Sequence, residues 1–72
     1  MPIPDGPVEG AVKWFKPAKR FGFIATDAVG DVYVHLQALE RSGLATLQAG
    51  QRVRLTVSAG TKGPQADKVE LI

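Results

Sequence analysis

The chain has no cysteine and a single histidine among its 72 residues. The absence of cysteine excludes a disulfide-stapled secreted scaffold and a cysteine-type zinc site. A chain this short forms one domain and buries only about 60% of the surface that its unfolded form exposes. Its stability must therefore come from packing alone, and a hydrophobic content of 44% is high enough for the chain to collapse.

Long hydrophobic runs are also missing, since no stretch approaches the ~18 apolar residues of a membrane span. The first nine residues have no cationic start and no apolar run, so they do not resemble a signal peptide. We therefore expect a cytoplasmic protein with no membrane partner. Pro2, Pro4, Gly6 and Pro7 predict a flexible arm over residues 1–9, followed by one domain over residues 10–72.

Short β-like runs, separated by Gly, Pro and Asp, fill most of this domain. They cover residues 11–15, 21–26, 31–35, 52–57 and 66–71. Runs of this length predict an all-β sandwich or barrel, and a small sheet avoids open edges by closing on itself. We expect a five-stranded antiparallel OB-type β-barrel, with an SH3-like barrel as the competing architecture. A short helical turn over residues 37–40, followed by a long loop, is expected between the third and fourth runs.

Alternation along the strands predicts which side chains are buried. Val53, Leu55 and Val57 share one face of the fourth run, and Val32 and Val34 share one face of the third. This places Tyr33 and His35 toward solvent. In the second run either Phe21 and Phe23 or Gly22 and Ile24 can be inside, and phenylalanine is more often found buried. In the first run an exposed Lys13 implies a buried Trp14, unless the strand bends.

The segment over residues 13–23 holds four of the nine cations and four of the aromatic residues, and no acid. The net charge of the chain is only +2, so its positive charge is local. Cations interleaved with aromatic rings suit single-stranded nucleic acid, because phosphates need cations and unstacked bases need flat apolar faces. The alternative is a solvated lysine-rich turn beside a core of aromatic residues.

Three blocks carry a specific resemblance: Lys13-Trp14-Phe15, Phe21-Gly22-Phe23-Ile24 and Val32-Tyr33-Val34-His35. In this order and spacing they resemble the cold-shock domain of bacterial cold-shock proteins, and the likeness continues through Lys62-Gly63-Pro64-Gln65-Ala66 to Val69. It covers roughly residues 10–70. The resemblance implies a five-stranded OB-type barrel that binds single-stranded RNA and DNA. It also implies an RNA chaperone, with effects on transcription and translation.

Site residues follow from the resemblance position by position. The stacking platforms it implies are Trp14, Phe21, Phe23, Tyr33 and His35, with Phe15 at their edge. It implies phosphate contacts from Lys13, Lys19 and Lys62, and a hydrogen bond between Asp31 and a base edge. The phenylalanines then face outward, and the barrel interior holds Ile24, Val32, Val34, Val53, Leu55 and Val57.

This chain departs from the family pattern at four positions. Arg20 stands where the family usually has glycine, which can mark a backbone angle unfavourable for arginine. Lys16 replaces an asparagine and adds a second extra cation to the predicted site. Leu36 and Leu44 replace aromatic residues, and a stacking platform is worth about 1–3 kcal/mol per base.

No catalytic constellation is visible, and we expect neither an enzyme nor a cofactor. Asp27 and Asp31 could approach each other and hold a metal, but aspartates at a turn usually bond their own backbone, so no metal site is predicted. Two other binding classes compete with the resemblance. An SH3-like barrel would grip a proline-rich peptide, although such grooves normally carry acids. The second competing class is a ribosome-associated OB module. We expect a monomer.

Binding by this chain should depend on salt more strongly than binding by its relatives. Two platforms are lost and two cations are gained, and each phosphate neutralised on a single strand contributes about −0.7 to the slope of log affinity against log salt. Affinity for a single-stranded oligonucleotide, measured between ~50 and ~200 mM salt, should fall steeply. A nearly constant affinity over this range would contradict the prediction.

Overall fold

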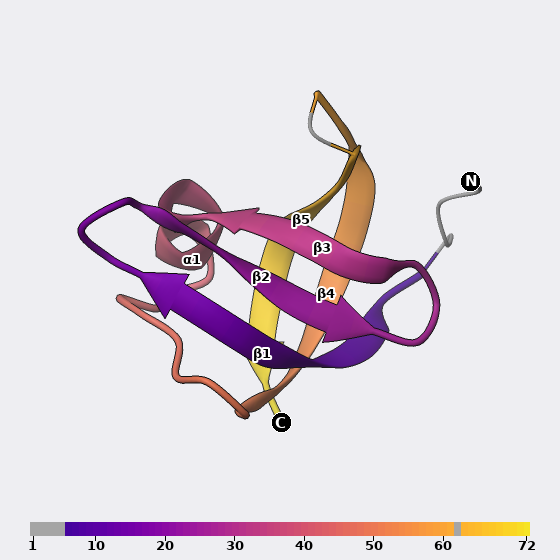
Figure 1. Cartoon of the computed structure of the whole chain (residues 1–72), viewed down its shortest axis with the longest axis horizontal. Helices are drawn as coiled ribbons and strands as arrows, with labels where there is room; N and C mark the ends of the chain where they lie inside the picture. The colour runs from indigo at the N-terminus through magenta and orange to yellow at the C-terminus, as the bar shows by residue number, and fades with distance from the viewer. Residues whose placement is uncertain (1–5, 62) are drawn as a thin grey trace.

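The computed structural model describes residues 6–61 and 63–72, which form five strands and one short helix (Figure 1). Their order along the chain is β1 (Val8–Lys16), β2 (Phe21–Thr26), β3 (Gly30–His35), α1 (Leu36–Arg41), β4 (Arg52–Gly60) and β5 (Gly63–Leu71). The five predicted strands and the helical turn are all present. Each strand extends to or beyond the residues expected from its sequence pattern.

The strands close into a barrel in the order β1-β2-β3-β5-β4. Four neighbouring pairs are antiparallel, whereas β3 and β5 pair in parallel at Tyr33 and Gln65. The predicted barrel is confirmed, but not its wholly antiparallel pairing. The reason is geometric: strand direction cannot alternate all the way around a ring with an odd number of members.

The first strand begins at Val8, inside the segment that we expected to be an arm. Val8 pairs with Leu55, and Glu9 pairs with Arg54. The arm prediction for residues 1–5 lies outside the described part of the chain. Within that part, the first strand begins two residues before Gly10, because β4 offers a partner to this segment.

Aliphatic side chains fill the barrel, and the predicted interior residues are all among them. Ile24, Val32, Val34 and Val53 are fully buried, with Leu55 and Val57 beside them. The other buried hydrophobic residues that complete the core are Val12, Phe15, Val29, Ala38, Leu39, Leu47, Ala66 and Val69. The alternation in β3 and β4 was therefore interpreted correctly.

A β-bulge interrupts the alternation in β1. Val12 pairs with Ile24, but Trp14 already pairs with Phe23, so Lys13 is an extra residue on this strand. The side chains of Lys13 and Trp14 consequently both reach solvent, and those of Val12 and Phe15 on either side are buried. This is the bend that an exposed Trp14 requires.

The helix α1 covers one end of the barrel and buries Ala38 and Leu39. It ends before Gly43, whose φ of 80° is not helical. The Ser42 hydroxyl donates to the carbonyl of Ala38 and accepts from the amide of Val69, at 3.0 Å in each case, which ties the helix to β5. Among the described residues, no helix is long and apolar enough to span a membrane.

The turn between β1 and β2 contains a strained residue. Arg20 has a φ of 64°, the only positive value for a non-glycine residue in the described part of the chain. Its amide donates to the carbonyls of Lys16 and Pro17, and its own carbonyl accepts from Leu36. These bonds hold Arg20 in a left-handed conformation that costs an L-residue roughly 1–2 kcal/mol.

Replacing Arg20 with glycine should therefore stabilise the fold. Glycine adopts a positive φ without this penalty, although it also adds freedom to the unfolded chain. We expect Arg20→Gly to raise the free energy of unfolding by about 0.5–1 kcal/mol, measured by urea denaturation. Ala18→Gly is the matched control: it adds a glycine to the same turn where φ is not positive, and it should lower stability. A loss of stability in both variants would contradict the assignment of strain.

Candidate nucleic-acid interface

The outer surface of β1, β2 and β3 is built from cross-strand rows of side chains. One row contains Trp14, Phe23 and Tyr33, and the next contains Lys16, Phe21 and His35. All five rings in these rows are partly exposed, while the residues between them on β2 and β3 point into the core. The structure thus brings the five predicted stacking residues together on one face, which we call the aromatic face (Trp14, Phe21, Phe23, Tyr33 and His35).

Neighbouring rings on the aromatic face contact one another. Trp14 lies 5.3 Å from Phe21 and 5.5 Å from Phe23, between ring centroids, and both pairs are strongly inclined. Phe21 and Tyr33 are stacked, with centroids 5.6 Å apart and planes inclined by 26°. Such pairs contribute about 0.5–1.5 kcal/mol beyond the area they bury. The rings therefore hold one another in place while part of each surface remains in water.

His35 also caps the helix that follows β3. Its Nδ1 accepts a hydrogen bond of 3.1 Å from the amide of Gln37, which fixes the orientation of the imidazole. The ring centroid lies 6.5 Å from that of Tyr33, so the imidazole continues the aromatic face at its α1 end. Sequence analysis predicted the exposure of His35 but not this positioning bond.

Phe15 does not lie at the edge of the aromatic face, and this prediction is wrong. Its side chain is only 9% exposed and belongs to the core, because the bulge at Lys13 turns it inward. Phe15 pairs with Gly22, where a Cβ atom would collide with the carbonyl of Trp14 and lie 2.8 Å from the Phe15 ring. Gly22 thus admits the Phe15 ring beneath β2, and a glycine at a buried strand position was the available sequence signal.

Three predicted cations gather at the end of the β1–β2 hairpin. Lys16, Lys19 and Arg20 are exposed, and none has an ion-pair partner among residues 6–61 and 63–72. Lys16 Nζ lies 5.7 Å from the centroid of the Trp14 ring, within range of a cation–π interaction. The predicted contact residue Lys62 lies outside the described residues.

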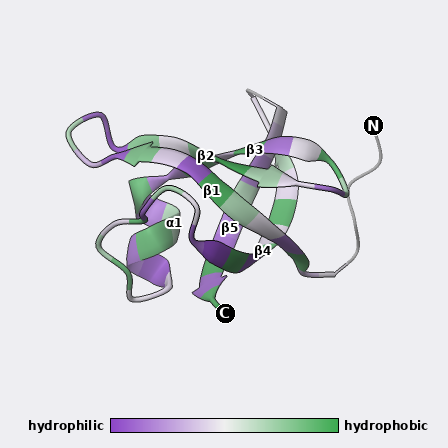
Figure 2. Cartoon of the chain, turned by 60° about the horizontal axis from the view of Figure 1, so that its bottom comes forward, coloured by the Kyte–Doolittle hydropathy of each residue, from purple (hydrophilic) through white to green (hydrophobic). Residues whose placement is uncertain are grey.

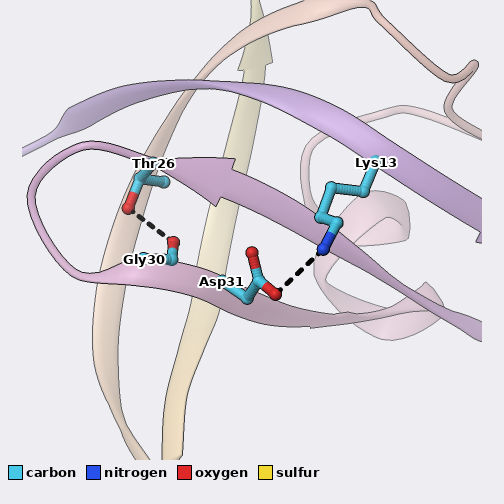
Figure 3. Close-up of polar contacts among 4 residues, drawn as sticks. All are labelled: Lys13, Thr26, Gly30 and Asp31. Carbon is cyan, nitrogen blue, oxygen red and sulfur yellow. Dashed lines mark hydrogen bonds and ion pairs between the residues drawn. The ribbon is translucent and has the colours of Figure 1, made fainter.

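Lys13 and Asp31 pair with each other at the opposite end of the aromatic face (Figure 3). Lys13 Nζ lies 3.1 Å from Asp31 Oδ2, and both side chains are about half exposed. An exposed pair of this kind is worth about 0–1 kcal/mol, so it can separate at little cost. The adjoining turn is held by Thr26, whose hydroxyl donates to the carbonyl of Gly30 at 2.9 Å.

The two leucines that stand where the family usually has aromatic residues add no stacking surface to the aromatic face. Leu36 and Leu44 are partly buried and pack against the core.

Two hollows on the barrel surface lie away from the aromatic face: one is lined in part by Arg54 and Lys68, the other in part by Glu9 and Asp27. In the described part of the chain, no group of three or more His, Asp or Glu side chains could hold a metal ion.

Comparison with known proteins agrees with this geometry. Residues 8–72 match the model of the "Cold-shock" DNA-binding domain. The chain belongs to this family of nucleic-acid-binding domains. It is 46% identical to a cold shock-like protein of Thermotoga maritima over 65 residues, which cover 90% of this chain and 98% of that protein. It is also 52% identical to the cold shock-like protein CspA of Vibrio cholerae over 61 residues, covering 83% and 87% of the two chains. The major cold shock protein CspA of Pseudomonas aeruginosa is 44% identical over 63 residues, covering 88% and 91%.

The inward and outward phenylalanines of this cold-shock domain should differ sharply in their effect on stability. Phe15→Ala removes a core ring and should lower the free energy of unfolding by about 3–5 kcal/mol, enough to unfold much of a domain this small. Phe21→Ala and Phe23→Ala should each cost clearly less, because their rings are already partly in water. Urea denaturation of the three variants measures the difference. Equal losses would mean that the aromatic face is part of the core.

Proposed function

We propose that this cold-shock domain binds single-stranded RNA and DNA by stacking bases on the aromatic face, while lysine and arginine side chains hold the phosphates. The observation that carries the proposal is the partial exposure of five neighbouring rings on one face. Burial of a phenylalanine side chain is worth about 1.5–3 kcal/mol, so rings left in water on a fold of marginal stability indicate a use in binding.

Nucleic acid suits this face better than other partners of the same size. The rings offer apolar surfaces for bases, and the exposed cations Lys16, Lys19 and Arg20 adjoin them without an intervening acid along the chain. Duplex keeps its bases stacked inside, and rings on a flat sheet cannot enter its grooves as a helix does. The aromatic face therefore favours unpaired strands of many sequences, since every base has a π-face.

RNA-chaperone behaviour follows from this mode of binding. A base that stacks on Phe21 or Phe23 is withheld from pairing, so bound protein shifts RNA toward its unpaired form by mass action. Effects on transcription and translation would arise where such structures control either process. The cytoplasmic location and the monomeric state stay predictions.

The other candidate functions have less support. An SH3-like groove for proline-rich peptides normally carries acids, whereas Lys16, Lys19 and Arg20 flank these rings. The family match over residues 8–72 favours a cold-shock domain over a ribosome-associated OB module. We propose a binding protein and not an enzyme, because the single histidine, His35, accepts a hydrogen bond from the amide of Gln37 through Nδ1 and caps α1.

Trp14 is the only tryptophan and lies on the aromatic face, so its fluorescence reports binding directly. Titration with a single-stranded oligonucleotide should change its emission at low concentrations of ligand, because a stacked base replaces water against the indole. Matched duplex should bind much more weakly. A similar response to both ligands, or none to either, would overturn the proposal.

Phe23→Ala provides the matching variant, since Phe23 pairs with both Trp14 and Tyr33. Loss of one stacking platform should lower affinity by about 1–3 kcal/mol, or roughly 5- to 150-fold, in a protein that stays folded. Leu71→Ala removes an exposed hydrophobic side chain from β5 and should leave affinity unchanged. Equal affinities of the Phe23→Ala variant and the unmodified protein would remove the stacking role.

A further inference from the structure

The cations at the end of the β1–β2 hairpin continue past the last ring of the aromatic face. We call residues 16–20 the cationic turn. It contains Lys16, Lys19 and Arg20, no acid and no aromatic residue, and every residue in it is exposed. The turn stands clear of the barrel in both Figure 1 and Figure 2. It can therefore meet phosphates, but it offers no surface on which a base could stack.

The two ends of the aromatic face differ in charge. At the β2–β3 turn Asp31 neutralises Lys13, and Asp27 adds an exposed acid. At the cationic turn three positive charges lie within five residues, with no ion-pair partner in the described part of the chain. A polyanion lying across the rings thus meets attraction at one end and a nearly balanced or repulsive field at the other.

Strain at Arg20 gives a second reason to assign a role to the turn. A positive φ at a non-glycine residue costs stability, and such strain tends to be kept at functional sites. Glycine would fit this backbone better but would remove a charge. Hydrogen bonds at both the amide and the carbonyl of Arg20, the latter with the amide of Leu36, fix the backbone from which the side chain extends.

We propose that the cationic turn holds the phosphate backbone of a duplex adjoining the bound single strand, so that the preferred ligand is a junction between single strand and duplex. This inference rests on the proposed function, because the single-stranded part must occupy the rings. A duplex suits the turn because its bases are hidden and its phosphates are dense, with one charge per about 1.7 Å of axis. Three clustered cations match that density better than the sparser phosphates of an extended strand.

The asymmetry of the face gives the inference a directional consequence. If the single strand lies on the rings in one fixed 5′-to-3′ direction, only one of its two ends reaches the cationic turn. A duplex can therefore lie on the turn only when it is attached to that end of the overhang. The other polarity brings the duplex toward Asp27 and Asp31. The 5′-overhang and 3′-overhang ligands should therefore differ in affinity although their bases are identical.

The test uses a GC-rich DNA duplex carrying a pyrimidine overhang at either the 5′ or the 3′ end, with the free overhang strand and the blunt duplex as references. Trp14 fluorescence gives the affinity for each at several salt concentrations. One junction should bind several-fold more tightly than the free strand at low salt. Its slope of log affinity against log salt should be steeper by about 2–3, since three cations meet duplex phosphates that contribute about 0.9 each.

The double variant Lys19→Ala/Arg20→Gly should abolish this preference: its affinity for the junction should fall by a larger factor than its affinity for the free strand, which the aromatic face still binds. Arg41→Ala/Lys68→Ala is the matched control: it removes the same charge from exposed positions on α1 and β5 and should retain the preference. Equal affinities for both junctions and the free strand would overturn the inference and leave the proposed function standing. Failure of the unmodified protein to bind the free strand would overturn the proposed function itself.

Discussion

The β-bulge in β1 is the constraint on which the aromatic face depends. One extra residue at Lys13 allows Val12 and Phe15 to face the core while Lys13 and Trp14 face water. With strict alternation, an inward Val12 would carry Trp14 inward with it, and the outward side would lose its largest ring. Because of the bulge, the two adjacent aromatic residues of β1 have different places: Phe15 lies in the core and Trp14 lies on the surface.

The second strand also supplies both the core and the aromatic face, but it does so without a bulge, because both of its phenylalanines lie on the outer side. Phe21 and Phe23 face outward, and Gly22 and Ile24 face inward, where Gly22 leaves room for the Phe15 ring. The core of this part of the barrel is therefore provided by β1, whose phenylalanine lies beneath the glycine of β2. Surface and interior are coupled through this contact, so a side chain added at Gly22 would disturb the ring below it and the backbone that carries Trp14.

Much of this arrangement can be read from the sequence, for reasons that differ from element to element. Alternation identified the interiors of β3 and β4, because Val32, Val34, Val53 and Leu55 lie on regular strands. It could not orient Phe21 and Phe23, since both faces of β2 are apolar, and only the family resemblance chose between them. The burial of Phe15 depends on the register between β1 and β2, which a reading of β1 alone cannot supply. The odd number of strands requires at least one parallel pair in a closed barrel, but that this pair is β3 with β5 depends on the strand order. The strand start at Val8 required knowledge of its partner Leu55.

The departures from the family pattern shift the balance between two kinds of binding energy. Leu36 and Leu44 pack against the core instead of offering flat rings to solvent, which suits the stability of a small barrel without disulfides. Arg20 and Lys16 add charge at the same end of the molecule, and Arg20 does so at a strained backbone position. Stacking depends little on ionic strength, whereas phosphate contacts weaken as salt rises. In the proposed binding mode the contributions therefore change along the barrel: stacking dominates around Phe23 and Tyr33, and electrostatic attraction dominates beyond Phe21.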